Sequence, residues 1–252
     1  IVIAVLFTIG GVMSVMKPLG NAIDIRTELD ARFGDQCSYR PPADGVVATD
    51  RIETFLRVRA TLSEPCRVIE HRSAAMRRLE ELDDDTDVSK TEAMALAGKA
   101  TMGAMGLGPA LGNLYEVRNQ ALLAEGMGLG EYSYIYLTAY QSQLTDDGPR
   151  TGIMDGSPIS KRLHGCVEDM LSKQLESARS IGADPAWLTE LEKELDAMVS
   201  DRRRLLWGDG LPPSVLASFE PYRDELDGVF CGAATELELL RGERRFLAIE
   251  SE

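Results

Sequence analysis

The sequence predicts an all-α protein, with a single N-terminal transmembrane helix followed by an extracytoplasmic helical bundle. Three observations support this prediction. The first sixteen residues carry no charge and are mostly apolar. The rest of the chain repeats apolar residues at three- and four-residue spacing between helix-capping and helix-breaking residues. No segment sustains the apolar–polar alternation, rich in β-branched residues, that is typical of strands.

Residues 1–16 are predicted to form a membrane anchor that the mature protein keeps. A helix of this length covers about 24 Å, somewhat less than the ~30 Å hydrocarbon core of a bilayer. We therefore expect further residues upstream to complete the span and to carry Lys or Arg. Gly10 and Gly11 would let another transmembrane helix pack closely. A signal peptide and a buried core helix are the open alternatives.

The predicted helices follow from capping and breaking residues. Gly34 ends the first helix, and Asp50 with Glu53 forms a capping box at the start of the second. Pro65 is expected to break that second helix. Asp184 is a predicted N-cap ahead of a proline at the first helical position. The expected helices span residues 22–33, 50–82, 91–105, 109–125, 129–144, 159–180, 184–206 and 213–241.

Residues 100–115 form an uncharged tract with several glycines around Pro109. The tract is too short, and too rich in glycine and proline, for a second transmembrane helix. We expect a bent, buried joint between two helices here. A contact surface for another subunit is the alternative.

Tyr132, Tyr136 and Tyr140 repeat at four-residue steps along one predicted helix. This spacing favours packing in the core, and the alternative is a surface for a partner, because tyrosine combines apolar area with a hydroxyl group. A pocket lined by Tyr132, Tyr136 and Trp187 would instead indicate a ligand-binding module.

The segment 145–158 carries the strongest linker signal, with three glycines, two prolines and three aspartates. It divides the chain into an anchor over residues 1–18, a helical subdomain over 19–148 and a second helical subdomain over 149–252. The two subdomains form either one bundle or two halves that meet near residue 150.

Four cysteines, Cys37, Cys66, Cys166 and Cys231, lie far apart and form no C-x-x-C motif. An even number of widely spaced cysteines after an anchor is typical of two disulfides in an oxidising compartment. Of the three pairings, Cys37–Cys66 with Cys166–Cys231 keeps both bridges local, and we expect that one. The alternative is four free, buried cysteines in a cytosolic domain.

Composition and motifs exclude several functions. The net charge of −14 argues against nucleic-acid binding and against an anionic lipid surface for the soluble domain. The basic clusters at residues 77–78 and 202–204 stand among acidic residues and are expected on ion-paired helix faces. No nucleophile elbow, zinc-protease motif or phosphate-binding loop is present.

No metal or cofactor is predicted. His164, Cys166, Glu168 and Asp169 are the only cluster of metal-ligand types, but on a helix residue 166 points away from 164 and 168. The acidic run at residues 83–87 lacks the glycine and glutamate that an EF-hand loop requires.

The leading functional hypothesis is a non-catalytic accessory or structural subunit of a membrane complex. The chain would be single-pass in the inner membrane, with its bulk in the periplasm. Its N-terminal helix would contact lipid and other integral membrane subunits. The alternatives are an anchored periplasmic binding module for a small ligand or peptide, and an enzyme whose atypical site would combine buried carboxylates with His164.

Overall fold

The computed structural model describes residues 24–80, 90–142, 144, 158–202, 204 and 206–239. Within these residues every regular element is helical and no β-strand occurs, so the predicted all-α class is confirmed. Among them, no helix combines the length and the apolar composition needed to cross a membrane. The predicted anchor, including Gly10 and Gly11, lies outside the described residues.

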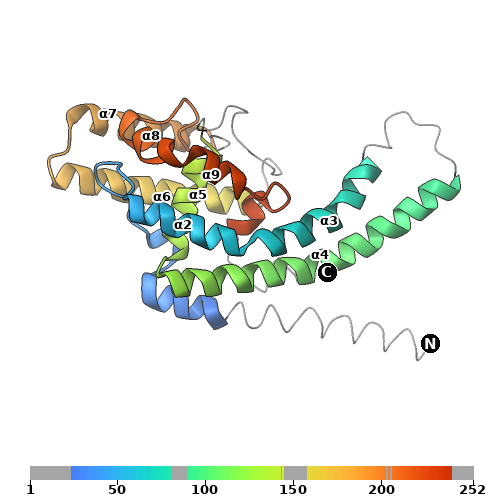
Figure 1. Cartoon of the computed structure of the whole chain (residues 1–252). Helices are drawn as coiled ribbons and strands as arrows, with labels where there is room; N and C mark the ends of the chain where they lie inside the picture. The colour runs from blue at the N-terminus through green and yellow to red at the C-terminus, as the bar shows by residue number, and fades with distance from the viewer. Residues whose placement is uncertain are drawn as a thin grey trace, which may run out of the picture.

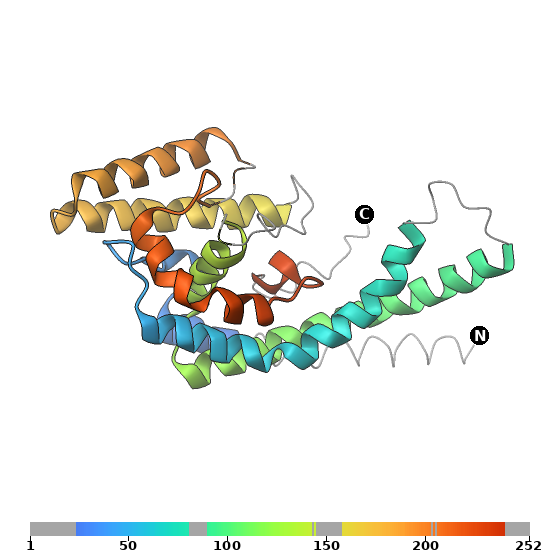
Figure 2. The same ribbon diagram turned by 45° about the horizontal axis from the view of Figure 1, so that its top comes forward.

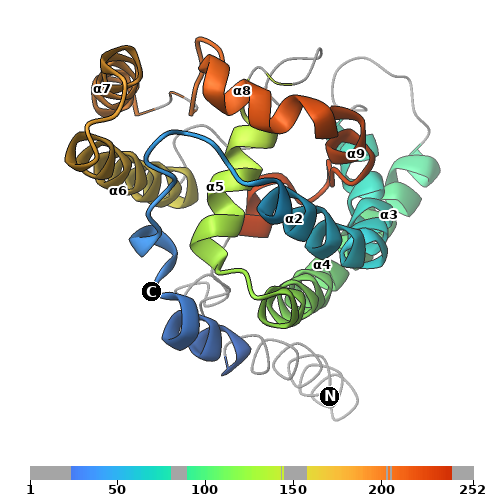
Figure 3. The same cartoon turned by 60° about the vertical axis from the view of Figure 1, so that its left-hand side comes forward.

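The short helix α5 (Leu129–Tyr140) lies in the middle of the body, between the other labelled helices (Figure 3). Eleven of its twelve side chains are buried, because its sequence is uncharged apart from one residue. That residue, Glu131, forms an ion pair with Arg51 at 2.6 Å between Oε2 and Nη2. A helix with this composition is stable in water only when other helices surround it.

The helices around α5 come from the whole length of the chain (Figures 1 and 3). Residues 24–33 are helical, and Gly34 ends that helix with φ +84°, as expected. Asp184 caps its helix as predicted, because its Oδ1 accepts a hydrogen bond from the amide of Ala186 at 2.7 Å. The elements of the body are η1 (Gln36–Ser38), α2 (Thr49–Thr61), α4 (Lys90–Glu125), α6 (Pro158–Ser180), α7 (Pro185–Ser200) and α8 (Pro213–Phe219).

A hairpin of two helices, α3 (Ser63–Glu80) and α4, extends beyond the other described elements (Figures 1 and 2). The chain breaks between α2 and α3 at Leu62, close to the predicted position. Pro65 lies in the first turn of α3, where its missing amide costs no helical hydrogen bond.

Two predictions about helices α2 and α4 are wrong. Ala48 and not Asp50 is the N-cap of α2, and no side chain caps that helix. The joint expected in residues 100–115 is absent, because α4 continues through Pro109 as one helix. An internal proline costs about 3 kcal/mol, and packing along α3 and burial of residues such as Leu114 offset that cost.

The expected single helix over residues 213–241 is also wrong. After α8 the chain forms the short elements η2 (Glu220–Tyr222), α9 (Arg223–Gly228) and η3 (Thr235–Leu239). Pro221 has no amide hydrogen to donate to a continuous helix, and α9 ends at Gly228. Apolar spacing alone did not reveal these breaks.

Both disulfides form, but the predicted pairing is wrong. The bridges are Cys37–Cys166 and Cys66–Cys231, with Cα–Cα distances of 4.7 and 5.9 Å. They join residues 129 and 165 positions apart. The preference for local pairs failed because η1 packs against α6, and α3 begins beside the segment that follows α9.

One hydrophobic cluster contains buried side chains from both sides of residue 150, from Leu29 to Leu239. Both disulfides also cross that position. The division into subdomains 19–148 and 149–252 stays a prediction, and most of the linker between them lies outside the described residues.

We predict that Gly130→Ala destabilises the fold. An added Cβ would overlap the carbonyl oxygen of Gln36 and lie 2.6 Å from Tyr39 Cβ, so η1 would have to move. The expected loss in the free energy of unfolding is about 1–3 kcal/mol. Gly165→Ala on α6 is the control, because its Cβ would meet nothing within 4 Å and should stabilise the helix by up to about 1 kcal/mol. Urea unfolding measures both, and equal stability of the two variants would contradict the packing described for Gly130.

Candidate functional site

Six side chains from four elements bind the backbone carbonyl groups of residues 226–239. This segment forms only short helical turns with several buried positions, so the carbonyl oxygens that the turns leave without an amide partner need donors from elsewhere. The donors come from η1, α2, α4 and α5. The carbonyls and their donors are Leu226 with Tyr140 Oη, Val229 with Arg59 Nη2, Thr235 with Tyr136 Oη, Leu237 with Tyr115 Oη, Glu238 with Arg118 Nη1, and Leu239 with Gln36 Nε2.

The carboxylate of Glu238 is the centre of a fully buried ionic group. Its Oε1 accepts hydrogen bonds from Arg59 Nη1 and from the hydroxyl of Tyr132, and all three side chains are completely buried. Burial acts against the charge of Arg59, but Glu238 and the neighbouring tyrosines hold its pKa well above the ordinary value. Arg59 therefore keeps its positive charge inside the core.

A second buried guanidinium, that of Arg118, also contacts the segment. Its Nε and Nη2 donate to Asn119 Oδ1 at 3.0 and 2.8 Å, and its Nη1 donates to the Glu238 carbonyl. The guanidinium carbon lies 5.2 Å from the centre of the Tyr115 ring. Burial lowers the pKa of Arg118 below its ordinary value, so this charge depends on its hydrogen bonds.

The tyrosine repeat belongs to the core. Tyr132, Tyr136 and Tyr140 are at most 1 % exposed, so the alternative of a partner surface is wrong for them. The guanidinium of Arg59 lies over the rings of Tyr136 and Tyr140, at 5.5 and 5.6 Å from their centres. The repeat therefore supplies hydroxyl donors and ring faces to the ionic group.

Tyr132, Tyr136 and Trp187, whose meeting in a pocket would indicate a ligand-binding module, contact different partners. The indole Nε1 of Trp187 donates to the carbonyl of Ala43 at 2.7 Å, and its ring packs against Trp207. Tyr132 donates to the Glu238 carboxylate, and Tyr136 donates to the carbonyl of Thr235.

The cluster around His164 does not assemble. His164 Nδ1 lies 3.0 Å from Glu168 Oε1, as their shared helix face predicts. Cys166 is bonded to Cys37, and Asp169 is exposed on another face. The acidic run at residues 83–87 lies outside the described residues.

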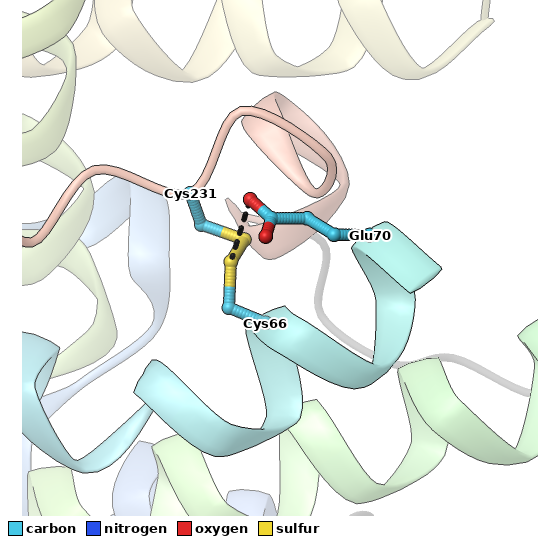
Figure 4. A group of neighbouring side chains, drawn as sticks. All are labelled: Cys66, Glu70 and Cys231. Carbon is cyan, nitrogen blue, oxygen red and sulfur yellow. Dashed lines mark hydrogen bonds between the residues drawn. A yellow bond between two sulfur atoms is a disulfide. The ribbon is translucent and has the colours of Figure 1, made fainter. Parts of the chain in front are cut away.

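A solvent-facing pocket of about 190 Å³ lies beside the second disulfide, and it is the candidate functional site. Cys66 and Glu70 reach it from the same face of α3, and Cys231 reaches it from the segment after α9 (Figure 4). Glu70 Oε1 lies 3.9 Å from Cys66 Sγ. Sites for drug-sized ligands occupy about 300–1,000 Å³, so this pocket suits an ion with its water molecules better than a metabolite.

The sequence analysis missed Arg59, Arg118 and Glu238 because charged residues are rarely buried. A signal was present for the two arginines. Arg59 follows Phe55 by four residues on the apolar face of α2, and Arg118 follows Leu114 by four on α4. Glu238 has no comparable signal, since the short turns around it have no helical period.

Comparison with known proteins gives no match. No family model matches the chain, and neither a curated protein nor a solved structure matches it.

We predict that Glu238→Gln strongly destabilises the protein, because it leaves the charge of Arg59 buried without its carboxylate. Breaking a buried pair in this way costs about 3–5 kcal/mol. Glu64→Gln is the matched control: it breaks an exposed pair with Arg67 and should change stability little. Denaturant unfolding followed by circular dichroism compares the two variants, and a Glu238→Gln protein as stable as the wild type would disprove the role of this ion pair.

We predict that stability falls as the pH rises from about 10 to about 12. Burial raises the pKa of Tyr115 and of Tyr134 to about 12, and that of Tyr132 to well above its ordinary value. The unfolded chain loses these protons near pH 10. The folded chain keeps them, so the full stabilisation is present below pH 10 and is lost as the pH rises.

Ultraviolet absorbance of phenolate, recorded together with circular dichroism, tests this prediction. Most tyrosines should ionise only as helicity is lost, whereas in denaturant all should titrate near pH 10. Ionisation of every tyrosine near pH 10 with the helices intact would refute it.

Proposed function

We propose that this chain is a non-catalytic accessory subunit of a larger membrane complex, with an acidic helical domain on the periplasmic side of the inner membrane. The observation that carries the proposal is the pair of long-range disulfides. Such bridges form and persist in oxidising compartments. The uncharged apolar segment at residues 1–16 supports attachment to the membrane and contact with lipid and other integral membrane subunits.

The use of the buried ionisable groups supports a structural role. Shifted pKa values often mark active sites, but structural ion pairs shift them too. Glu238 binds Arg59 and Tyr132, and Arg118 binds Asn119 and backbone. These contacts occupy the charged groups of Glu238, Arg59 and Arg118 within the core. Such an arrangement is consistent with a structural subunit rather than an enzyme.

The α3–α4 hairpin supports binding to a protein partner. It extends beyond the other described elements, so two helices project from the rest of the described fold (Figures 1 and 2). The part of α4 at residues 100–109, ahead of its buried residues, contains no charged residue. An uncharged stretch rich in small residues suits close contact with another helix.

The test is gentle solubilisation of native membranes, followed by identification of the proteins that co-purify with the chain. We expect a defined set of integral membrane proteins to accompany the full chain. A variant in which a cleavable export signal replaces residues 1–16 should fold in the periplasm, with both disulfides formed and normal helicity, but should no longer co-purify. The full chain migrating alone would contradict the role of a subunit, and undiminished co-purification of the shortened variant would contradict the anchor.

A further inference from the structure

Three metal-ligating side chains meet at the pocket beside the second disulfide. One ligand atom from each of Cys66, Glu70 and Cys231 lies within 4.8 Å of the other two (Figure 4). In the described part of the chain, no other group of three or more cysteine, histidine or carboxylate ligands is as close together. In the oxidised protein the two sulfur atoms are bonded to each other, which leaves Glu70 as the only good ligand.

Reduction would turn these three groups into a suitable ligand set for zinc. Zinc binds cysteine sulfur at about 2.3 Å and carboxylate oxygen at about 2.0–2.2 Å in tetrahedral geometry. Two sulfur ligands of one zinc ion then lie about 3.8 Å apart, compared with about 2.05 Å in a disulfide. An opening of about 1.7 Å therefore suffices. Cys231 is placed for such a shift, because it lies on irregular backbone between α9 and η3.

Charge and space around the three groups also suit a cation. Two thiolates and a carboxylate carry three negative charges, against the two positive charges of zinc. The nearby guanidinium groups of Arg59 and Arg67 are already paired, with Glu238 and Glu64. The pocket of about 190 Å³ leaves room for water as the fourth ligand.

We propose that Cys66, Glu70 and Cys231 form a zinc site when their disulfide is reduced. A dithiol reductant supplies two electrons and two protons: the Sγ–Sγ bond breaks, two thiols form, and the reductant becomes a disulfide. Zinc then binds both sulfurs as thiolates and releases two protons to solvent. The ion links α3 to the segment after α9, as the disulfide does, so the link persists in both redox states.

The first disulfide provides an internal control for this site. Cys37 and Cys166 join η1 to α6, and within the described residues they belong to no group of three ligands. A zinc site specific to Cys66 and Cys231 must therefore survive the loss of the first pair.

The experiment measures zinc binding by the full chain after reduction with a phosphine, with a chromophoric chelator as competitor. Cobalt(II) is the spectroscopic probe, because thiolate coordination gives it charge-transfer and tetrahedral bands. We expect one ion per reduced chain and none per oxidised chain. Glu70→Gln should weaken zinc binding at least about tenfold, since loss of even an outer-shell partner costs about 10–100-fold. Glu64→Gln, six residues earlier on α3, should not.

Two further variants complete the test. The double variant Cys66→Ser with Cys231→Ser should lose the ion, and Cys37→Ser with Cys166→Ser should keep it. If either fails to fold, Glu70→Gln decides the question, because its exposed side chain can change while both disulfides form and are checked before reduction. Equal zinc affinity of the reduced wild type and Glu70→Gln, or loss of zinc with Cys37 and Cys166, overturns the proposal.

Discussion

A backbone segment that is buried without regular helix needs hydrogen-bond donors for its carbonyl groups. In this chain, residues 226–239 form short turns with several buried positions, and six side chains from η1, α2, α4 and α5 supply donors to their carbonyl groups. Each donor is long enough to reach across from another helix. This requirement explains why α5 carries tyrosine at every fourth position and why α2 and α4 each bury an arginine.

The ionic group at Glu238 follows from the same requirement. A guanidinium group that donates hydrogen bonds inside the core also carries a positive charge, which needs a negative charge nearby. Glu238, which lies in the segment at residues 226–239, provides this carboxylate for Arg59. A buried pair adds little stability compared with apolar packing, but it strongly penalises arrangements that separate its members. The pair therefore specifies where the C-terminal segment lies, and the Cys66–Cys231 disulfide fixes the same segment covalently.

Local sequence signals correctly predicted helix ends where a single residue determines the end. Gly34 ends a helix, Asp184 caps one, and Pro65 accompanies a break. The failures share a physical cause, which is that tertiary contacts override local preference. Packing against α3 carries α4 through Pro109, although a proline alone predicts a break there.

The candidate site shows the same limit. The cysteines were recognised as disulfide candidates from number and spacing, but their pairing depends on which helices become neighbours. Glu70 follows Cys66 by four residues, so the sequence alone places both on one face of α3. Cys231 is 165 positions from Cys66 in the sequence. No local pattern contains that information.

Two long-range disulfides close this fold, and the proposed periplasmic location requires that they form in cells. The most direct test is to block free thiols in intact cells that make the full protein, before lysis. The protein is then digested without reduction, and the linked peptides are identified by mass spectrometry. The account predicts Cys37 linked to Cys166 and Cys66 linked to Cys231, with no blocked cysteine. Four blocked cysteines, or a link between Cys37 and Cys66, would contradict it.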